Sequence, residues 1–206
     1  MRQLPNMTHA TYRELAYGSG RTGGVALTSI DDALPDCERC HAEDGRGSPD
    51  VPVLAGQREA YLLSALDAYA SGKRASGVMG AAAGRVDRDT IIALARHYAN
   101  LPSRLAEYTS GASGEALAQH IVENGLPETN LPACVNCHAP GKRPDYPLLG
   151  GQKFEYMAAR LRRWRGEANV VDARKPNESM PVIARRIPED MIDPLARYYA
   201  RQGHAP

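Results

Sequence analysis

The chain has 206 residues, a formal net charge of +1 and a mean hydropathy of -0.45. This near balance of charge argues against a nucleic acid as partner, because phosphate binding needs a clear excess of Lys and Arg. No apolar run approaches the roughly 18 to 20 residues of a transmembrane helix, and the N-terminus lacks the basic start and apolar middle of a secretory signal. The sequence therefore predicts a soluble protein with one large domain or two small ones.

Helical patterns run through the first half. Thr11 and Glu14 have the spacing of a capping box, which predicts a helix ahead of the first cysteine pair. Residues 57–73 carry apolar side chains at helical spacing. Asp87 is a candidate N-cap of a further helix, whose apolar stripe consists of Ile91, Leu94, Ala95 and Tyr98.

The second half has similar helical segments at 153–165 and 189–201. Pro194 lies inside the last of them and should kink that helix or delay its start. Another helix is predicted at 113–125, because Ser begins it and Gly ends it. Residues 101–114, rich in Pro, Ser and Gly, are the predicted linker.

The chain repeats itself in fixed order. CERCH at 37–41 corresponds to CVNCH at 134–138, and PVLAGQREAYL from Pro52 corresponds to PLLGGQKFEYM from Pro147. Later, VMGAAAGRVDRDTIIALARHYA from Val78 corresponds to SMPVIARRIPEDMIDPLARYYA from Ser179. Such self-similarity indicates a tandem duplication. We therefore predict an all-α fold with two domains, residues 1–105 and 106–206.

Each half contains a CxxCH sequence, the spacing that attaches a c-type haem. Two thiols three positions apart reach the two vinyl groups, and the adjacent His turns its imidazole onto the iron. Four Cys and two His could alternatively bind zinc, and a CxxC pair can also be a thiol–disulfide motif. The complete repeat around each pair favours haem. We predict two covalently attached haem c groups, one held by Cys37, Cys40 and His41 and the other by Cys134, Cys137 and His138.

The composition agrees with large embedded cofactors. Aromatic residues make up 6% of the chain, with a single Phe and a single Trp, which is thin for two cores of about 100 residues each. A haem at the centre of each half would contribute the missing apolar surface.

Met79 and Met180 occupy equivalent positions in the repeat, each in a predicted loop before the last helix. A thioether there would complete the iron coordination. A lone Met is usually core filler, but equivalence across two copies favours a ligand. Met157 and Met191 have no Met counterpart, so core or surface roles are predicted for them. The histidines without a repeated partner are not expected to be ligands: His9, His97, His120 and His204.

Further repeated residues are candidates for support of the haem. A metal-bound His usually donates its other ring hydrogen to a carbonyl, and the carbonyls of Pro52 and Pro147 are the predicted acceptors. One Tyr and one Gln begin the next helix in each half, and they are either hydrogen-bond donors to haem propionates or simple core residues: Tyr61 and Gln57 in the first half, Tyr156 and Gln152 in the second.

In these motifs the sequence resembles the cytochrome c4 family, the two-domain members of the class I c-type cytochromes. The resemblance covers residues 34–101 and 112–206, whereas the first 33 residues match poorly. It rests on CxxCH, then P-x-L-x-G-Q-x-x-x-Y, then the Met, then the ALARHYA or PLARYYA helix, twice in order. The resemblance implies two helical domains, low-spin haems ligated by His and Met, and periplasmic electron transfer.

His/Met ligation leaves no open iron position and suits a one-electron carrier better than a catalyst. The leading hypothesis is electron shuttling from a quinol-oxidising complex or dehydrogenase to a terminal oxidase, with room for peripheral association with a membrane. The alternative is a cytochrome subunit or soluble domain of a larger redox enzyme, such as a sulfide-oxidising flavocytochrome or an oxidase complex. A catalytic dihaem enzyme is disfavoured, because haem attachment uses all four Cys. Attachment requires export, so the N-terminus is interpreted as a mature or trimmed end.

The charge is distributed unevenly. Residues 31–50 hold seven acidic and two basic residues, whereas 142–186 hold eleven basic and five acidic ones. Ordinary solvated helix faces would explain this pattern. Alternatively, the acidic approach to haem 1 and the basic face around haem 2 dock different partners.

Overall fold

The computed structural model describes residues 25–74, 76–103, 105, 116–139, 141–166 and 179–202. Within these ranges the regular structure is helical, and extended residues form only isolated bridges, such as that between Leu27 and Val86. The predicted all-α class is confirmed. None of the helices in these ranges is long and apolar enough to cross a membrane.

In the first half, the described helices are α2 (Ile30–His41), α3 (Glu59–Ala70), α4 (Gly77–Ala83) and α5 (Arg88–Asn100). Asp87 caps α5 as predicted, since its carboxylate accepts a hydrogen bond of 2.8 Å from the Thr90 N–H. Ser29 caps α2 in the same way through the Asp32 N–H, at 3.2 Å. The capping box at Thr11 and Glu14 lies outside the described residues.

In the second half, the described elements are α6 (Ala116–Asn124), η1 (Pro127–Thr129), α7 (Val135–His138), α8 (Phe154–Gly166), α9 (Ser179–Arg186), η2 (Glu189–Met191) and α10 (Ile192–Ala200). Gly125 follows α6 with φ at 76°, the left-handed conformation of a helix-ending glycine. Pro194 delays the last helix, as expected: a 3₁₀ turn precedes α10, and the proline lies in its first turn, where no backbone hydrogen bond is lost.

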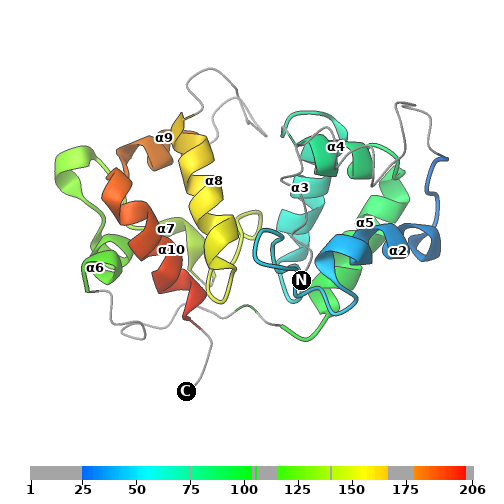
Figure 1. Cartoon of the computed structure of the whole chain (residues 1–206), viewed down its shortest axis with the longest axis horizontal. Helices are drawn as coiled ribbons and strands as arrows, with labels where there is room; N and C mark the ends of the chain where they lie inside the picture. The colour runs from blue at the N-terminus through cyan, green and yellow to red at the C-terminus, as the bar shows by residue number, and fades with distance from the viewer. Residues whose placement is uncertain are drawn as a thin grey trace, which may run out of the picture.

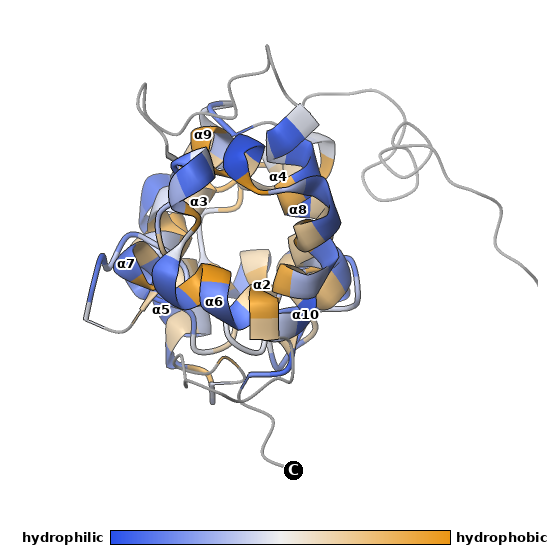
Figure 2. Ribbon diagram, turned by 90° about the vertical axis from the view of Figure 1, so that its left-hand side faces the viewer, coloured by the Kyte–Doolittle hydropathy of each residue, from blue (hydrophilic) through white to orange (hydrophobic). Residues whose placement is uncertain are grey.

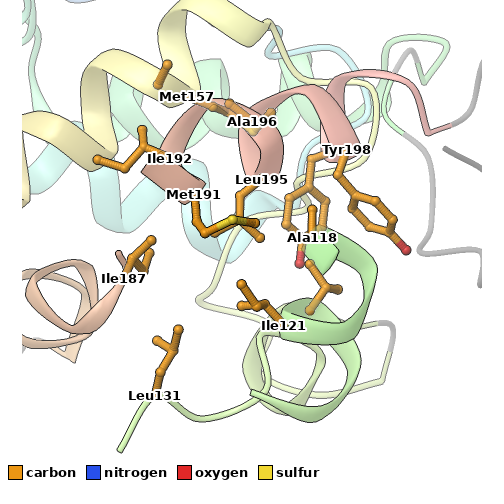
Figure 3. Close-up of a cluster of buried hydrophobic side chains, with 13 residues drawn as sticks. Ala118, Ile121, Leu131, Met157, Ile187, Met191, Ile192, Leu195, Ala196 and Tyr198 are labelled. Atoms are coloured by element: carbon orange, nitrogen blue, oxygen red, sulfur yellow. The ribbon is translucent and has the colours of Figure 1, made fainter. Parts of the chain in front are cut away.

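The helices of each half pack around apolar residues of that half. Figure 2 shows that single helices carry both hydrophobic and hydrophilic residues. In the first half, Ala33 of α2 meets Leu62 of α3 and Leu94 of α5. In the second half, Ile121 of α6 packs with Leu195 and Tyr198 of α10 (Figure 3). Periodic apolar stripes on separate helices therefore meet within, and not between, the two sequence repeats.

The two halves form neighbouring lobes (Figure 1) that are joined by reciprocal hydrogen bonds. The Gln57 side chain donates to the Leu148 carbonyl (3.1 Å) and accepts from the Leu148 N–H (2.9 Å). The Gln152 side chain does the same with Val53, at 3.1 and 2.8 Å. Gln57 and Gln152 are equivalent in the repeat, as are Val53 and Leu148, so the same contact is made twice in opposite senses. Such reciprocity is typical of a two-fold interface.

A small apolar cluster lies at this junction. Val53 and Ala55 pack with Leu105, and Leu148 of the second half covers the same cluster. Ser103 donates a hydrogen bond of 2.7 Å to the Leu105 carbonyl. The rest of the predicted linker, from residue 106 onward, lies outside the described residues. Leu105 therefore fixes the start of the linker beside the interface.

The buried glutamine pairs predict a measurable contribution to stability. Replacing Gln152 by Leu leaves the N–H and carbonyl of Val53 buried without partners. We expect Gln152→Leu to lower the free energy of unfolding of the holoprotein by about 1 to 3 kcal/mol, measured by urea denaturation. Gln119→Leu, on α6 away from the interface, is the matched control and should change it by less than about 0.5 kcal/mol. Equal losses in both variants would contradict the assigned role.

Candidate haem-attachment sites

The two CxxCH motifs lie at the ends of helices. Cys37, Cys40 and His41 form the last turns of α2, while Cys134 precedes α7 and His138 ends it. All four cysteines are free thiols that are half-buried in the structure. Each motif thus presents two thiols and an imidazole from a single helical turn.

His41 is buried, His138 is partly buried, and each imidazole is oriented by a proline carbonyl. The Nδ1 atom of His41 lies 3.3 Å from the Pro52 oxygen, and that of His138 lies 3.0 Å from the Pro147 oxygen. Burial lowers the pKa of both rings, and the proline carbonyls oppose this by accepting from the ring N–H. A neutral ring whose Nδ1 donates has its Nε2 lone pair available for a metal.

The described residues do not form the kind of cluster that a zinc site needs. They contain no group of three or more His, Cys, Asp or Glu side chains placed to hold a metal ion. Burial, with help from Asp36 and Glu38, raises the pKa of Cys37 to about 11, and burial also raises the pKa of Cys134 to about 11. The arrangement of the side chains favours covalent attachment over thiolate ligation.

Met79 and Met180 lie in the first turns of the short helices α4 and α9, and not in loops as the sequence suggested. Ser76 causes this in the first half, because its hydroxyl caps α4 by accepting from the Met79 N–H at 3.1 Å. Met79 lines a small cavity together with Cys37 and Asp36, and the other lining residues are apolar: Leu27, Ala33, Leu66, Ala82, Ala83, Val86, Ile91 and Leu94. The candidate sulfur ligand and a motif cysteine therefore share a mostly apolar environment, which suits an apolar cofactor between them.

Two tyrosines that the sequence analysis did not predict as site residues also lie beside the cysteines. Tyr98 and Tyr199 are equivalent in the repeat and are 4% and 7% exposed. Cys134 packs against the apolar cluster that contains Tyr199, and burial next to Cys37 raises the pKa of Tyr98. Their equivalent positions in ALARHYA and PLARYYA could have identified them as candidate site residues from the sequence.

Gln57 and Gln152, the candidate propionate donors, use both ends of their amides on the opposite half of the chain. Tyr61 and Tyr156 gather around the side chain of Arg74, with the Arg74 Nη2 3.4 Å from the Tyr156 hydroxyl. The repeated Gln residues therefore serve the interface, and the repeated Tyr residues surround a buried cation.

Arg74 is 3% exposed, and its guanidinium lies 4.6 Å from the centre of the Tyr69 ring. Its Nε atom has no hydrogen-bond partner, and no carboxylate among the described residues pairs with it. An uncompensated buried cation costs several kcal/mol. The site therefore fits an anionic group from outside the chain, such as a haem propionate.

The structure places the remaining methionines that it describes in the core, as predicted, and gives the surroundings of two of the remaining histidines. Met157 and Met191 are buried in the apolar cluster of the second half. His120 is exposed on α6 and contacts Asn124. His97 stacks edge-on against Tyr98, at 5.1 Å between ring centres. His9 and His204 lie outside the described residues.

Comparisons with known proteins agree with this geometry. No family model matches the sequence. The thiosulfate dehydrogenase electron acceptor of Stutzerimonas stutzeri is 31% identical over 173 residues, which are 81% of this chain and 79% of that protein. Cytochrome c4 of Stutzerimonas stutzeri is 33% identical over 176 residues, 79% of this chain and 82% of that protein.

Solved structures give the same answer. Cytochrome c4 of Acidithiobacillus ferrooxidans superposes with a TM-score of 0.68 at 27% identity, over 81% of this chain and 99% of that one. A thiosulfate dehydrogenase of Marichromatium purpuratum has a TM-score of 0.67 at 30% identity, over 92% of this chain but only 39% of that one.

The fold and the paired motifs define a dihaem class I c-type cytochrome, a protein that transfers electrons. The relatives are named as cytochromes and electron acceptors, so the chain is an electron carrier and has redox partners. More specifically, it belongs to the cytochrome c4 family.

Tyr156, the partly buried tyrosine beside Arg74, predicts a stability change at alkaline pH. Burial raises the pKa of Tyr156 to about 12, whereas an unfolded Tyr titrates near 10. The unfolded state therefore loses this proton first, and the free energy of unfolding falls between about pH 10 and 12. We expect Tyr156→Phe to show a shallower fall than the wild type in urea titrations across this range. The same pH dependence of the free energy of unfolding in both proteins would contradict this assignment to Tyr156.

Proposed function

We propose that each half of the chain holds one covalent haem c. Cys37 and Cys40 attach the first haem and Cys134 and Cys137 the second, with His41 and His138 as proximal ligands. Met79 and Met180 supply the sixth ligands. A haem held by these residues would exchange one electron between its ferric and ferrous forms, and iron ligated by both His and Met would have no open position for a substrate. The domain boundary at 105/106 is part of the same proposal.

The observation that carries this proposal is the pair of imidazoles, each with its Nδ1 atom at a proline carbonyl. A ring without a metal on its other nitrogen has no need of this arrangement in two equivalent places. The mostly apolar cavity between Cys37 and Met79 supports the proposal. So does the buried guanidinium of Arg74, which pairs with no carboxylate among the described residues and suits a propionate.

The haem count tests attachment. We expect the purified wild type to contain two haems per chain by the pyridine haemochrome assay. The double variant Cys37→Ser/Cys40→Ser should contain one, as should Cys134→Ser/Cys137→Ser, because each pair serves its own haem. Zinc in the purified protein, or fewer than two porphyrins in the wild type, would refute the proposal.

The sixth ligands are tested spectroscopically. Ferric iron bound to a Met sulfur has a weak near-infrared band. Met79→Ala and Met180→Ala should each remove about half of this absorbance, since each deletes one of two equivalent sulfur ligands. Met157→Leu, a volume-conserving change in the core, is the control and should keep the full band. A band unaffected by Met79→Ala or Met180→Ala would rule out that residue as ligand.

We further propose that the chain acts in the periplasm and receives electrons from a thiosulfate-oxidising dehydrogenase, passing them toward a terminal oxidase. Export follows from the covalent chemistry of the CxxCH motifs. The donor class is supported by a relative that is named for accepting electrons from thiosulfate dehydrogenase. Free shuttling is favoured because the chain matches 99% of a cytochrome c4 structure.

A second candidate function is that of a cytochrome domain working inside a larger redox enzyme. The superposition on 39% of a thiosulfate dehydrogenase favours it. Sedimentation of the holoprotein with such a dehydrogenase distinguishes the two. A stable complex at micromolar concentration supports the subunit role, whereas rapid reduction without a detectable complex supports the shuttle.

Different docking faces for donor and acceptor are tested by salt dependence. The acidic residues beside the first motif and the basic residues of α8 should give opposite effects of ionic strength on electron exchange with anionic and cationic reagents. Stopped-flow rates between about 10 and 500 mM salt measure this. Equal slopes for both reagents would remove the idea of two differently charged docking faces.

A further inference from the structure

One arginine of the first half is hydrogen-bonded to the segment that follows His138 in the second half. Arg58 immediately precedes α3, and its guanidinium donates to three backbone carbonyls of residues 139–146. The acceptors are Ala139 at 3.0 Å, Arg143 at 2.7 Å and Tyr146 at 3.0 Å. This segment connects His138 to Pro147, the two residues whose hydrogen bond orients the second imidazole. Arg58 therefore holds both ends of the loop that shapes the proximal side of haem 2.

The equivalent contact in the other direction is missing from the described residues. Lys153 is the repeat counterpart of Arg58, yet its hydrogen bond is made by its backbone N–H to the Gln152 side chain. No hydrogen bond links the Lys153 side chain to residues 42–51 within the ranges that the structure describes. The glutamine contacts are therefore made in both directions across the interface, whereas the Arg58 contact is made in one direction.

The charge of Arg58 lies beside the second proximal loop and not the first, because its three carbonyl acceptors all lie between His138 and Pro147. Arg143 lies in the same loop, but its guanidinium is paired with Asp145 at 3.0 Å. The carbonyls that bind Arg58 are neutral, so they do not cancel its positive charge.

The charges beside the cysteines differ in the opposite sense. Asp36 and Glu38 flank Cys37 and raise its pKa. Ala133 and Val135 flank Cys134 at the equivalent positions and carry no charge. Anions near an iron favour its ferric state, and cations favour its ferrous state, because reduction lowers the positive charge by one.

We propose that Arg58 raises the reduction potential of haem 2 from across the domain interface, because its positive charge would stabilise the form of the haem with one more electron. The inference rests on the proposed function, in which His138 is the proximal ligand of haem 2. Arg58 acts as a positioning and charge-bearing residue, not as a ligand.

The test compares Arg58→Gln, Arg58→Lys and the control Lys153→Gln in the holoprotein. Haem methyl NMR signals followed during a redox titration give a separate potential for each haem. We expect Arg58→Gln to lower the ferrous-to-ferric ratio of haem 2 at a fixed potential by roughly three- to tenfold; tenfold corresponds to 59 mV for one electron. Haem 1 should change by less than about twofold, and Lys153→Gln should leave haem 2 unchanged.

Arg58→Lys separates charge from loop geometry. Lysine keeps the positive charge but cannot donate to three carbonyls as a planar fork. We expect it to retain more than half of the wild-type potential difference between the haems. A loss as large as in Arg58→Gln, an unchanged haem 2 in Arg58→Gln, or an equal shift of both haems would overturn the proposal. The pyridine haemochrome count and the near-infrared band keep this separate from the proposed function, because both should stay at wild-type values in all three variants.

Discussion

The site depends on how two imidazoles are held. Each ring has its Nδ1 atom within hydrogen-bond distance of a proline carbonyl, at 3.3 and 3.0 Å. Burial lowers the pKa of both rings, and the carbonyl determines which nitrogen carries the hydrogen. Proline suits this position because its ring fixes φ and so restricts the backbone that carries the acceptor. The second cysteine of each motif directly precedes the histidine, and the first lies about one turn earlier, so the same helical segment places all three side chains.

Duplication gives the molecule both symmetric and asymmetric contacts. The reciprocal glutamine pairs join the halves through backbone groups that any sequence would provide, so they survive side-chain divergence between the copies. Arg58 and Arg74 do not follow this symmetry. One donates into the proximal loop of the second half, and the other is buried beside tyrosines of both halves. The repeat therefore builds two similar sites, and single arginines at their junction make those sites unequal.

Particular residues mark the limits of sequence reasoning. The Asp87 cap and the delay caused by Pro194 were predictable, since both effects act within one turn of helix. Met79 was expected in a loop and lies in a helix that Ser76 caps. The Gln57 and Gln152 amides were considered for a cofactor, and they bind the opposite half of the chain. Nothing local distinguishes these uses, because the partner of each glutamine lies more than 90 residues away.

The sequence by itself determined the duplication, the helical class, the two attachment motifs and the repeated methionines. These are properties of spacing, and spacing of three or four residues is set by covalent geometry and the pitch of a helix. Only the tertiary structure decided which side chains meet across the two halves. The burial of Arg74, the reach of Arg58 and the glutamine pairs depend on how two packed domains are turned against each other. That orientation results from many weak long-range contacts, and no single sequence motif predicts them.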